Sequence, residues 1–441
     1  MNKLHQLFIS ALTVLLPSAA LAQNGSNTSY SRFGLGTLAE QSQTFNRGMG
    51  GVAYGLRNGS QVNMQNPASY SGIDSLSFLF DVGLTLQYGH MSQAGKSTNA
   101  RNTTLSNINA GFHVGKNLGM SIGFMPYTTI GYTFTDNGKV GSTSNTSQDI
   151  TQKTTYTGNG GLNQLYIGIG WKPFANLSVG ANLGYMWGDY NHSMSQSFQE
   201  NGAASTSYSN QNQVYSTEMR TYKLQFGVQY PIRLTAQDWL SLGATYNLGH
   251  SIGGKSSLLR YTSAGDSTEV STSKAFDLPQ SIGAGIAWQH KNQLTIAGDF
   301  TYEKWGSCHM PVAGKDVNND ITYTPQKGMY SNSMRFALGA EYTPDAMSRH
   351  YMGTVKYRAG FNITTPYLKV NGQDGPSEYR ATIGIGLPLQ AKKLSGRSVI
   401  NVSAEWMMRK PSVENMIKEN YFLINLGITF NERWFMKWKI N

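Results

Sequence analysis

The chain has 441 residues, a formal net charge of +11, 49 glycines, 25 tyrosines and a single cysteine, Cys308, which excludes an intrachain disulfide. Its Lys and Arg residues are scattered and lack the basic helix or aromatic-interleaved motif of a nucleic-acid-binding protein, so we expect no nucleic-acid partner. No stretch after the first 22 residues approaches the ~20 consecutive apolar residues that a transmembrane helix needs.

The first 22 residues have the features of a signal peptide. Lys3 precedes an apolar stretch from Leu7 to Leu16, and a small-x-small run ends at Ala22. This order of charge, apolar core and small residues predicts export, with cleavage before Gln23. The apolar core is too short to cross a bilayer as a helix.

Residues 23–74 are rich in Gly, Asn and Ser and do not alternate in polarity. They contain Arg47-Gly48-Met49-Gly50-Gly51 and Asn66-Pro67-Ala68. A wide barrel leaks unless its lumen is filled, so we predict that this segment is an N-terminal hatch. The glycine run superficially matches a phosphate loop but lacks the GK[ST] ending. The Asn-Pro-Ala run is alternatively a plain turn that steers the chain into the wall.

From Ser75 almost to the C-terminus, apolar and polar residues alternate in about fourteen short segments. In the first, Phe78 and Val82 fall on one face of a strand, and Asp81 and Thr85 fall on the other. A pleated strand has a period of two, and lipid outside with water inside explains the split. We therefore predict an all-β fold, a transmembrane antiparallel β-barrel over residues 75–441.

Long polar connections alternate with short turns between these segments. Long loops belong outside the cell and tight turns in the periplasm, so an even strand count puts both chain ends on the periplasmic side of a Gram-negative outer membrane. Asn425, Gly427 and Phe430 have the polar, glycine, aromatic spacing of a barrel-assembly signal, so we expect the barrel assembly machinery as a partner during insertion. The predicted long loops are Gly89 to Leu105, Thr135 to Gly160, Asn191 to Val214, Ser251 to Ala275, Gly306 to Met329 and Thr364 to Ser377.

The third predicted strand, Leu118 to Phe134, contains Gly123 and Pro126. Proline has no backbone N–H and removes a ladder hydrogen bond, so it is normally excluded from the middle of a closed sheet. We predict a kink or bulge in the wall at this point. Alternatively, the range holds two shorter strands with the proline near a strand end.

A glycine-rich hatch ending in Asn66-Pro67-Ala68, followed by about fourteen strands with a proline inside the third, resembles the FadL family of outer-membrane transporters of hydrophobic compounds. The resemblance covers nearly the whole chain after the signal peptide. It implies that the hatch plugs the barrel and that a kink near Pro126 opens a lateral passage toward the bilayer. The family's ligand residues match no motif here and are not transferred.

The strand face opposite to the lipid carries many charges, which we expect to face the lumen. Arg or Lys there can hold the carboxylate of a fatty acid or another amphiphile. Alternatively, these groups pair across strands and dock the hatch, through Arg32, Arg47 or Arg57 for instance. The candidates for ligand binding or hatch docking are Lys223, Arg335, Lys356, Arg358 and Arg380.

No motif indicates catalysis, a cofactor or a metal site. The chain has no HExxH or GxSxG sequence, and Cys308 with His309 lies in a long connection without an identifiable third partner. The acidic stretch from Asp316 to Asp320 lacks the spacing of a calcium loop. We therefore expect a protein that is not an enzyme and that binds no cofactor or metal.

The sequence favours a passive transporter of hydrophobic or amphipathic small molecules, such as long-chain fatty acids, with hatch movement and lateral exit near Pro126. Its expected partners are outer-membrane lipid and the hydrophobic ligand. The competing hypothesis is a structural subunit of an outer-membrane assembly or secretion complex, which would bind other outer-membrane proteins. A transporter needs an apolar path from the loops to the lateral gap, whereas a scaffold needs an exposed interaction patch. The hatch disfavours a general water-filled porin.

Overall fold

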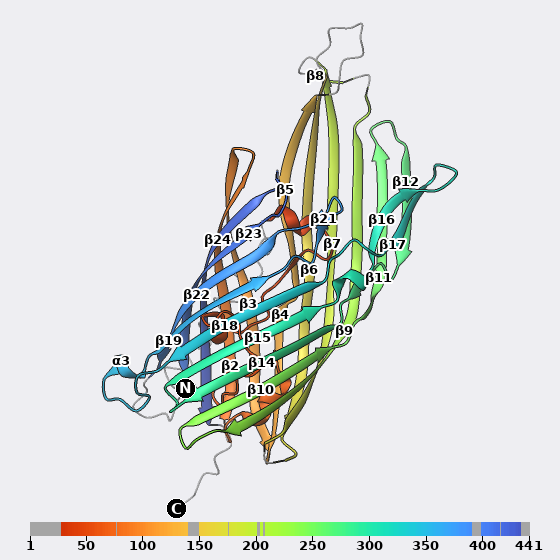
Figure 1. The fold of residues 1–441 in the computed structure, drawn as a ribbon. Coiled ribbons are helices and arrows are strands. Elements are labelled where there is room, and N and C mark those ends of the chain that lie inside the picture. Colours follow the sequence, from red (N-terminus) through yellow and green to blue (C-terminus); the bar gives the residue numbers. More distant parts are fainter. Residues whose placement is uncertain are drawn as a thin grey trace, which may run out of the picture.

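The structure is a computed structural model that describes residues 28–433, apart from 76, 140–149, 175, 201–202, 206–207, 390–397 and 415. The predicted signal peptide lies outside the described residues. The described residues form a closed antiparallel barrel of fourteen wall strands, as predicted (Figure 1). The barrel closes where the last strand, β24, pairs with the first, β2.

The wall strands follow one another in chain order, and three of them are interrupted. The first half consists of β2 (Ser77–Gln93), β3 (Lys96–Gly115), β4 (Leu118–Pro126) continued by β5 (Thr128–Lys139), β6 (Ile150–Trp171), β7 (Ser178–Glu200), β9 (Gln211–Arg233) and β10 (Asp238–Asn247) continued by β11 (His250–Thr262). The second half consists of β12 (Ser267–Ser273), β13 (Phe276–Leu278) and β14 (Ser281–His290), then β15 (Leu294–Glu303), β18 (Ser333–Tyr342), β19 (Lys356–Thr364), β22 (Ser377–Pro388), β23 (Val399–Lys410) and β24 (Lys418–Arg433).

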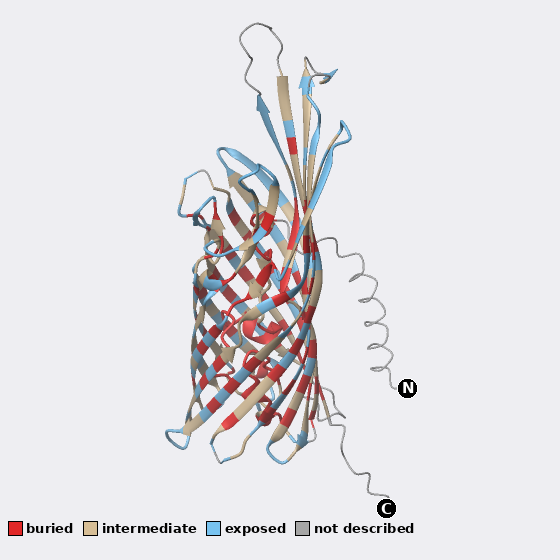
Figure 2. Cartoon of the chain, turned by 90° about the vertical axis from the view of Figure 1, so that its right-hand side faces the viewer, coloured by how far each residue is buried: buried red, intermediate tan, exposed pale blue. Residues whose placement is uncertain are grey.

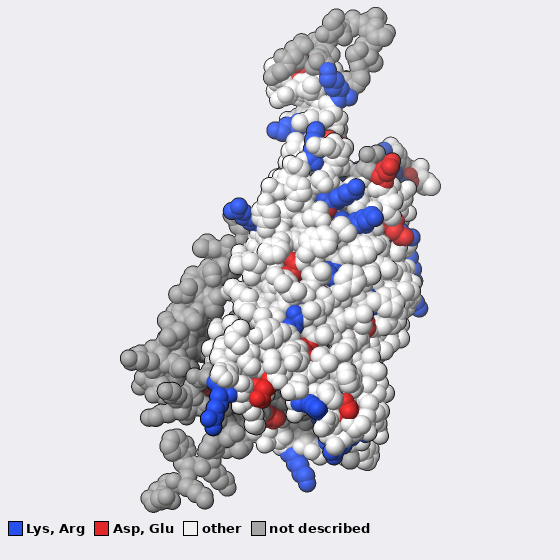
Figure 3. Space-filling view, turned by 60° about the vertical axis from the view of Figure 1, so that its left-hand side comes forward, with Lys and Arg blue, Asp and Glu red and all other residues white. Residues whose placement is uncertain are grey.

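The outer face of the wall is apolar, as the period of two predicts. On β6, Leu165, Ile167 and Ile169 are exposed, whereas Tyr166 and Gly168 between them are buried (Figure 2). Charged side chains gather toward the two ends of the barrel, and the band between them carries few charges (Figure 3). An apolar belt around a closed barrel is stable only in lipid, so the protein lies in the outer membrane of a Gram-negative bacterium.

The long extracellular loops predicted from the sequence are wrong in large part, because most of their residues form strands. β2 and β3 stay paired up to Gln93 and Lys96, so the loop predicted for Gly89 to Leu105 is a turn at Ala94 and Gly95. The same holds for the tall extensions of β6, β7 and β9, which rise above the barrel in Figure 1. Further hairpins in these regions are β11 with β12, β16 (Met310–Lys315) with β17 (Ile321–Gln326), and β20 (Lys369–Val370) with β21 (Gln373–Asp374), while β8 (Ala203–Ala204) pairs antiparallel with the end of β7.

The hatch fills the lumen with short elements joined by buried irregular chain. Its most buried side chains include Leu35, Val52 and Tyr70, which pack against the inner wall in separate apolar clusters. No described helix is long and apolar enough to cross a membrane. The hatch elements are η1 (Ser29–Arg32), β1 (Thr37–Leu38), α2 (Thr44–Arg47) and η2 (Pro67–Gly72); outside the hatch lie η3 (Trp305–Ser307) and α3 (Tyr351–Thr354).

Candidate functional site: the hatch and the seam between β3 and β5

The wall is interrupted in its third strand. β4 ends at Pro126 and β5 begins at Thr128, with Tyr127 between them outside the ladder. β3 pairs with β4 only as far as Ile108 opposite Phe124. Beyond that point the described part of β3 pairs with β2, and β5 pairs with β6. We call these two facing edges, β3 from residue 96 to 107 and β5, the seam.

The hatch covers part of one edge of the seam, β5, by adding its own strand. In β1, Thr37 lies opposite Thr129 and Leu38 lies opposite Thr128. The Ala39 N–H donates to the Tyr127 carbonyl over 2.9 Å, which continues the pairing into the break. An unpaired strand edge accepts another strand through its backbone groups, and here that strand belongs to the hatch.

The two residues predicted to form the kink behave differently. Gly123 lies in regular pairing, opposite Asn109 on one side and Tyr166 on the other. Pro126 is the last residue of β4, and its carbonyl accepts a hydrogen bond from the Gln41 side chain of the hatch over 3.1 Å. The ladder therefore ends at the proline, and the wall carbonyl freed by the break is satisfied by the hatch.

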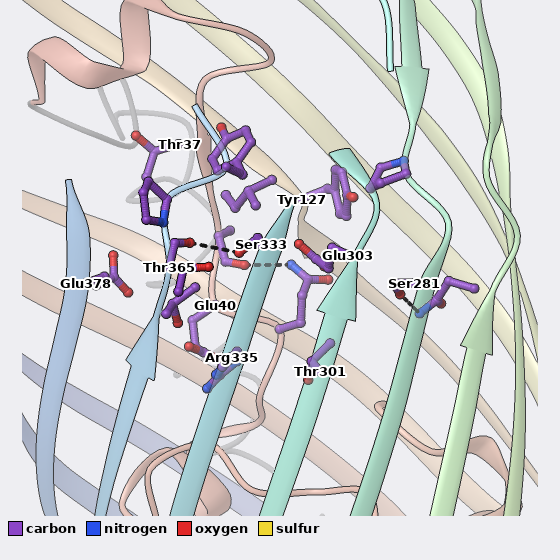
Figure 4. Close-up of a pocket in the computed structure, with 18 of the residues that line it drawn as sticks. Thr37, Glu40, Tyr127, Ser281, Thr301, Glu303, Ser333, Arg335, Thr365 and Glu378 are labelled. Atoms are coloured by element: carbon purple, nitrogen blue, oxygen red, sulfur yellow. Dashed lines mark hydrogen bonds and ion pairs between the residues drawn. The ribbon is translucent and has the colours of Figure 1, made fainter. Parts of the chain in front are cut away.

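A buried ion-pair cluster fixes the hatch just after β1. The Glu40 carboxylate lies 3.1 Å from Arg335 and 3.3 Å from Arg380, both on the wall (Figure 4). Burial alone would raise the pKa of Glu40, but Arg335, Arg380 and the hatch residue Arg47 lower it well below its ordinary value. Two of the predicted lumen candidates, Arg335 and Arg380, are therefore hatch anchors in this structure.

Hydrogen bonds to further wall strands hold other parts of the hatch. Arg47 donates to Thr85 over 2.7 Å and to Asn425 over 2.9 Å. The Asp299 carboxylate accepts the backbone N–H groups of Ala53, over 2.6 Å, and Tyr54, over 3.0 Å. Because a buried backbone donor without a partner costs about 1–3 kcal/mol, these acceptors make the docked position specific.

The Asn66-Pro67-Ala68 motif both shapes the hatch and fastens it. The Asn66 side-chain oxygen caps η2 by accepting the Ala68 N–H, and Pro67 occupies the first turn. The same side chain donates to the carbonyl of Val228 on β9 over 3.1 Å. Nearby in the hatch, the Arg57 guanidinium donates to the Ser178 hydroxyl of β7 over 2.9 Å, which adds a second link to the wall.

Glycines on the inner wall let the hatch backbone come close. A Cβ atom at Gly360 would overlap the backbone of Met49 and Gly50, and one at Gly339 would overlap the Met49 carbonyl. Gly50 itself has a φ of +67°, and its N–H donates to Thr382 over 2.9 Å. The predicted glycine run is therefore a tight turn seated on the wall.

A chamber of about 230 Å³ lies on the extracellular side of the hatch, next to the break in the third strand. Tyr127 and Glu303 line it, together with Lys223 of β9 (Figure 4 labels the first two). The Lys223 Nζ lies 4.9 Å from the centroid of the Tyr127 ring, and it makes no ion pair with a described residue. The chamber thus holds an ammonium group available to a ligand.

A larger vestibule of about 1020 Å³ lies on the periplasmic side of the hatch. The hatch residues Phe45, Met49 and Leu56 line it, as does Glu341, which binds Lys356 over 3.4 Å and Arg358 over 2.6 Å. The chamber and the vestibule share no lining residue. The hatch therefore separates them in this state.

Several functional residues carry no signal in the sequence. Glu40, the acceptor of two wall arginines, lies in a segment without periodicity, and Tyr127 differs from the other strand tyrosines only by following Pro126. All three arginines suggested for docking contact wall strands. Arg47 and Arg57 do so through hydrogen bonds, and Arg32 does so by stacking over the Tyr156 ring of β6 at 4.1 Å.

A family model described as BamG matches residues 4–441. Solved structures with similar folds include the toluene transporter TodX of P. putida, at 17% identity and a TM-score of 0.58, covering 90% of this chain and all of that one. The toluene transporter TbuX of Ralstonia pickettii is 15% identical, with a TM-score of 0.58, and the match covers 89% of this chain and 98% of that one. A Pseudomonas aeruginosa FadL homologue is 13% identical, with a TM-score of 0.53, and the match covers 88% of this chain and 98% of that one. These similarities confirm the FadL-like fold, and no curated protein matches the chain.

Proposed function

The chain belongs to the BamG family, and from its fold and its seam we propose that it passively transports small hydrophobic or amphipathic molecules across the outer membrane. The observation that carries this proposal is the seam, where β3 and β5 do not pair with each other among the described residues and a two-residue hatch strand pairs with β5. Displacing β1 opens a path from the chamber to the lipid without crossing the periplasm. The similar solved structures described as toluene transporters support the transport of a hydrophobic molecule.

The chamber favours compact ligands. Its volume of about 230 Å³ lies below the ~300–1,000 Å³ of typical drug-sized pockets, so it suits a molecule of about one ring better than an extended chain. The Tyr127 ring and Leu38 offer apolar contact, and Lys223 offers a charge to a carboxylate. A long-chain fatty acid would require the hatch to move before it could bind fully.

A reversible lock on β1 tests the proposal. Leu38 and Thr128 are directly opposed, and the ~4.5–5.5 Å between paired Cα atoms suits a disulfide. In a Cys308→Ser background, we expect oxidised Leu38→Cys/Thr128→Cys protein in proteoliposomes to lose toluene uptake, and reduction to restore it. The matched control, Thr133→Cys/Thr157→Cys, joins β5 to β6 and should leave uptake unchanged. Undiminished uptake through the locked protein would refute exit at the seam.

A second candidate function is that of a structural subunit of an outer-membrane assembly complex. The observation in its favour is the division of the lumen, because the chamber and the vestibule share no lining residue. A structural role does not require the hatch to move. Cells that carry only the locked protein should then keep normal amounts of other outer-membrane barrels, whereas depletion of the protein should lower them. Unchanged barrel amounts on depletion would exclude this role.

A further inference from the structure

Several large apolar side chains are exposed on the periplasmic turns. Phe174 is 70% exposed, Leu234 53%, Met347 94% and Met352 64%. Each lies in a connection that follows the periplasmic end of a wall strand, beyond the lipid-facing Trp171 and similar residues. Apolar groups of this size in water normally mark an interaction site.

Two of these turns, together with the short turn between them, form one continuous arc. The Lys291 N–H donates to the Gln237 carbonyl over 2.8 Å, which joins turn 290–293 to turn 233–238. The Thr343 N–H donates to the Gln293 carbonyl over 2.7 Å, which joins the same turn to the longer turn 343–355. We call this arc, together with turn 172–177, the periplasmic rim.

The longer turn of the rim has a defined shape. The Asp345 N–H donates to the Gly353 carbonyl over 2.9 Å, and the Asp345 carboxylate accepts the Met347 N–H over 2.9 Å. The Thr354 hydroxyl donates to the Tyr351 carbonyl over 2.7 Å at the end of α3. Met347 and Met352 are thus presented on an ordered turn, which lowers the entropy cost of binding a partner.

The rim is basic. The side chains of Lys172, Lys291 and Arg349 make no hydrogen bond or ion pair with any residue that the structure describes. The acidic groups of the rim have local partners: Asp238 binds His290 over 2.7 Å, and Asp345 caps its own turn. Cations therefore dominate the charge that the rim offers to a partner.

The rim also surrounds the vestibule, which continues the apolar surface into the barrel. Lys172 and Met347 line the vestibule, and the hatch contributes Phe45, Met49 and Leu56. Its volume of about 1020 Å³ reaches the upper end of small-molecule pockets, and only a polypeptide can fill the vestibule while contacting the rim outside it. Lipid headgroups do not enter the lumen of a closed barrel.

We propose that the periplasmic rim and the vestibule form a docking surface for an acidic periplasmic protein. Its carboxylates would face Lys172, Lys291 and Arg349, and its apolar side chains would cover Phe174 and Met347. Opposite charges at the rim of such an interface steer association, and the apolar centre holds the complex together. The proposal is independent of transport and deepens the structural-subunit candidate by naming the chemistry of a partner.

Site-specific photo-cross-linking in intact cells tests this surface. A benzoylphenylalanine placed at Phe174 or Met347 should give a discrete, light-dependent adduct with a protein of acidic isoelectric point. The same probe at Val317, fully exposed on the extracellular hairpin, is the matched control and should not give this adduct. The triple variant Lys172→Glu/Lys291→Glu/Arg349→Glu should lower the adduct at least 10-fold.

Each other outcome overturns the proposal. Adducts with phospholipid alone would show that the rim lies among headgroups, and absence of an adduct would show that no partner is present. An adduct that forms equally well in the triple variant would show that the partner does not bind through acidic groups. Heat-modifiable migration on gels checks that the triple variant is folded, and unchanged toluene uptake by the same variant separates this result from failure of the transport proposal.

Discussion

Replacing Glu40 with Gln should loosen the hatch without disturbing the wall. The substitution removes the carboxylate shared by Arg335 and Arg380. Arg380 retains Glu378 at 2.6 Å and Glu405 at 3.4 Å, so it stays compensated. Arg335 keeps only the Gly50 carbonyl, at 3.3 Å, among its described hatch contacts.

The loss of the Glu40 carboxylate from Arg335 sets the expected loss of free energy of hatch docking. Removing one partner of a buried ion pair costs about 3–5 kcal/mol, and the partial compensation places this case at about 3 kcal/mol. At about 1.4 kcal/mol per factor of ten, the hatch should open about 100-fold more often. The amide groups of Gly50, Ala53 and Tyr54 report this opening directly, because each donates to a wall side chain.

Hydrogen exchange of these three amides, measured in detergent, is the assay. Glu341→Gln is the matched control, because Glu341 binds Lys356 and Arg358 within the wall and touches no described hatch residue. We expect hatch protection to fall about 100-fold in Glu40→Gln and less than about 3-fold in the control. Equal protection in both variants would refute the view that Glu40 fastens the hatch.

Three further outcomes are expected. Lys223→Met removes the unpaired ammonium from the chamber, so benzoate uptake should fall about 10-fold while toluene uptake is maintained. Gly360→Ala forces a side chain into the backbone of Gly50, so the hatch should become protease-sensitive at a cost of about 1–3 kcal/mol, unlike Gly115→Ala, where a Cβ meets nothing. Because the folded pKa of Glu40 is lowered, the stabilisation that Glu40 contributes is complete above its unfolded pKa of about 4.3 and is lost only as the pH falls further toward the folded value; the ratio of hatch protection between the wild type and Glu40→Gln should therefore be constant from about pH 8 to about pH 5.

A specific result would contradict each of these three predictions. Loss of toluene uptake in Lys223→Met would make the lysine a support of the chamber wall instead of a ligand group. Protease resistance in Gly360→Ala would mean that the wall yields to the added methyl group. A smaller ratio of hatch protection between the wild type and Glu40→Gln at pH 5 than at pH 8 would show that a group with a higher pKa than Glu40 carries this docking.

The alternation of the sequence predicts the part of each strand that lies in lipid and no more. Leu165, Ile167 and Ile169 alternate with buried or small residues, because one face of β6 meets lipid and the other meets the hatch. The upper part of β6, from Thr151 to Thr157, has water near both faces and is polar at both parities. Its hydrogen-bonded ladder is nevertheless continuous, and a segment that is polar at both parities does not reveal such a ladder in the sequence.

The hatch shows the opposite limit of sequence reasoning. Its existence follows from composition and length, and Asn66-Pro67-Ala68 predicts a turn that the structure contains as a capped η2. Its docking depends on contacts with residues far away in the chain, such as Glu40 with Arg335. No local period encodes a pair of this kind, so the anchors emerge only from the folded chain.

Arg47 also has a consequence for how the molecule is made. Its guanidinium donates to Thr85 on β2 and to Asn425 on β24, the two strands whose pairing closes the barrel. This arginine can therefore complete its contacts only after the last strand has found the first. The N-terminal segment is synthesised long before β24, so the hatch reaches its fully docked position only when the barrel has closed.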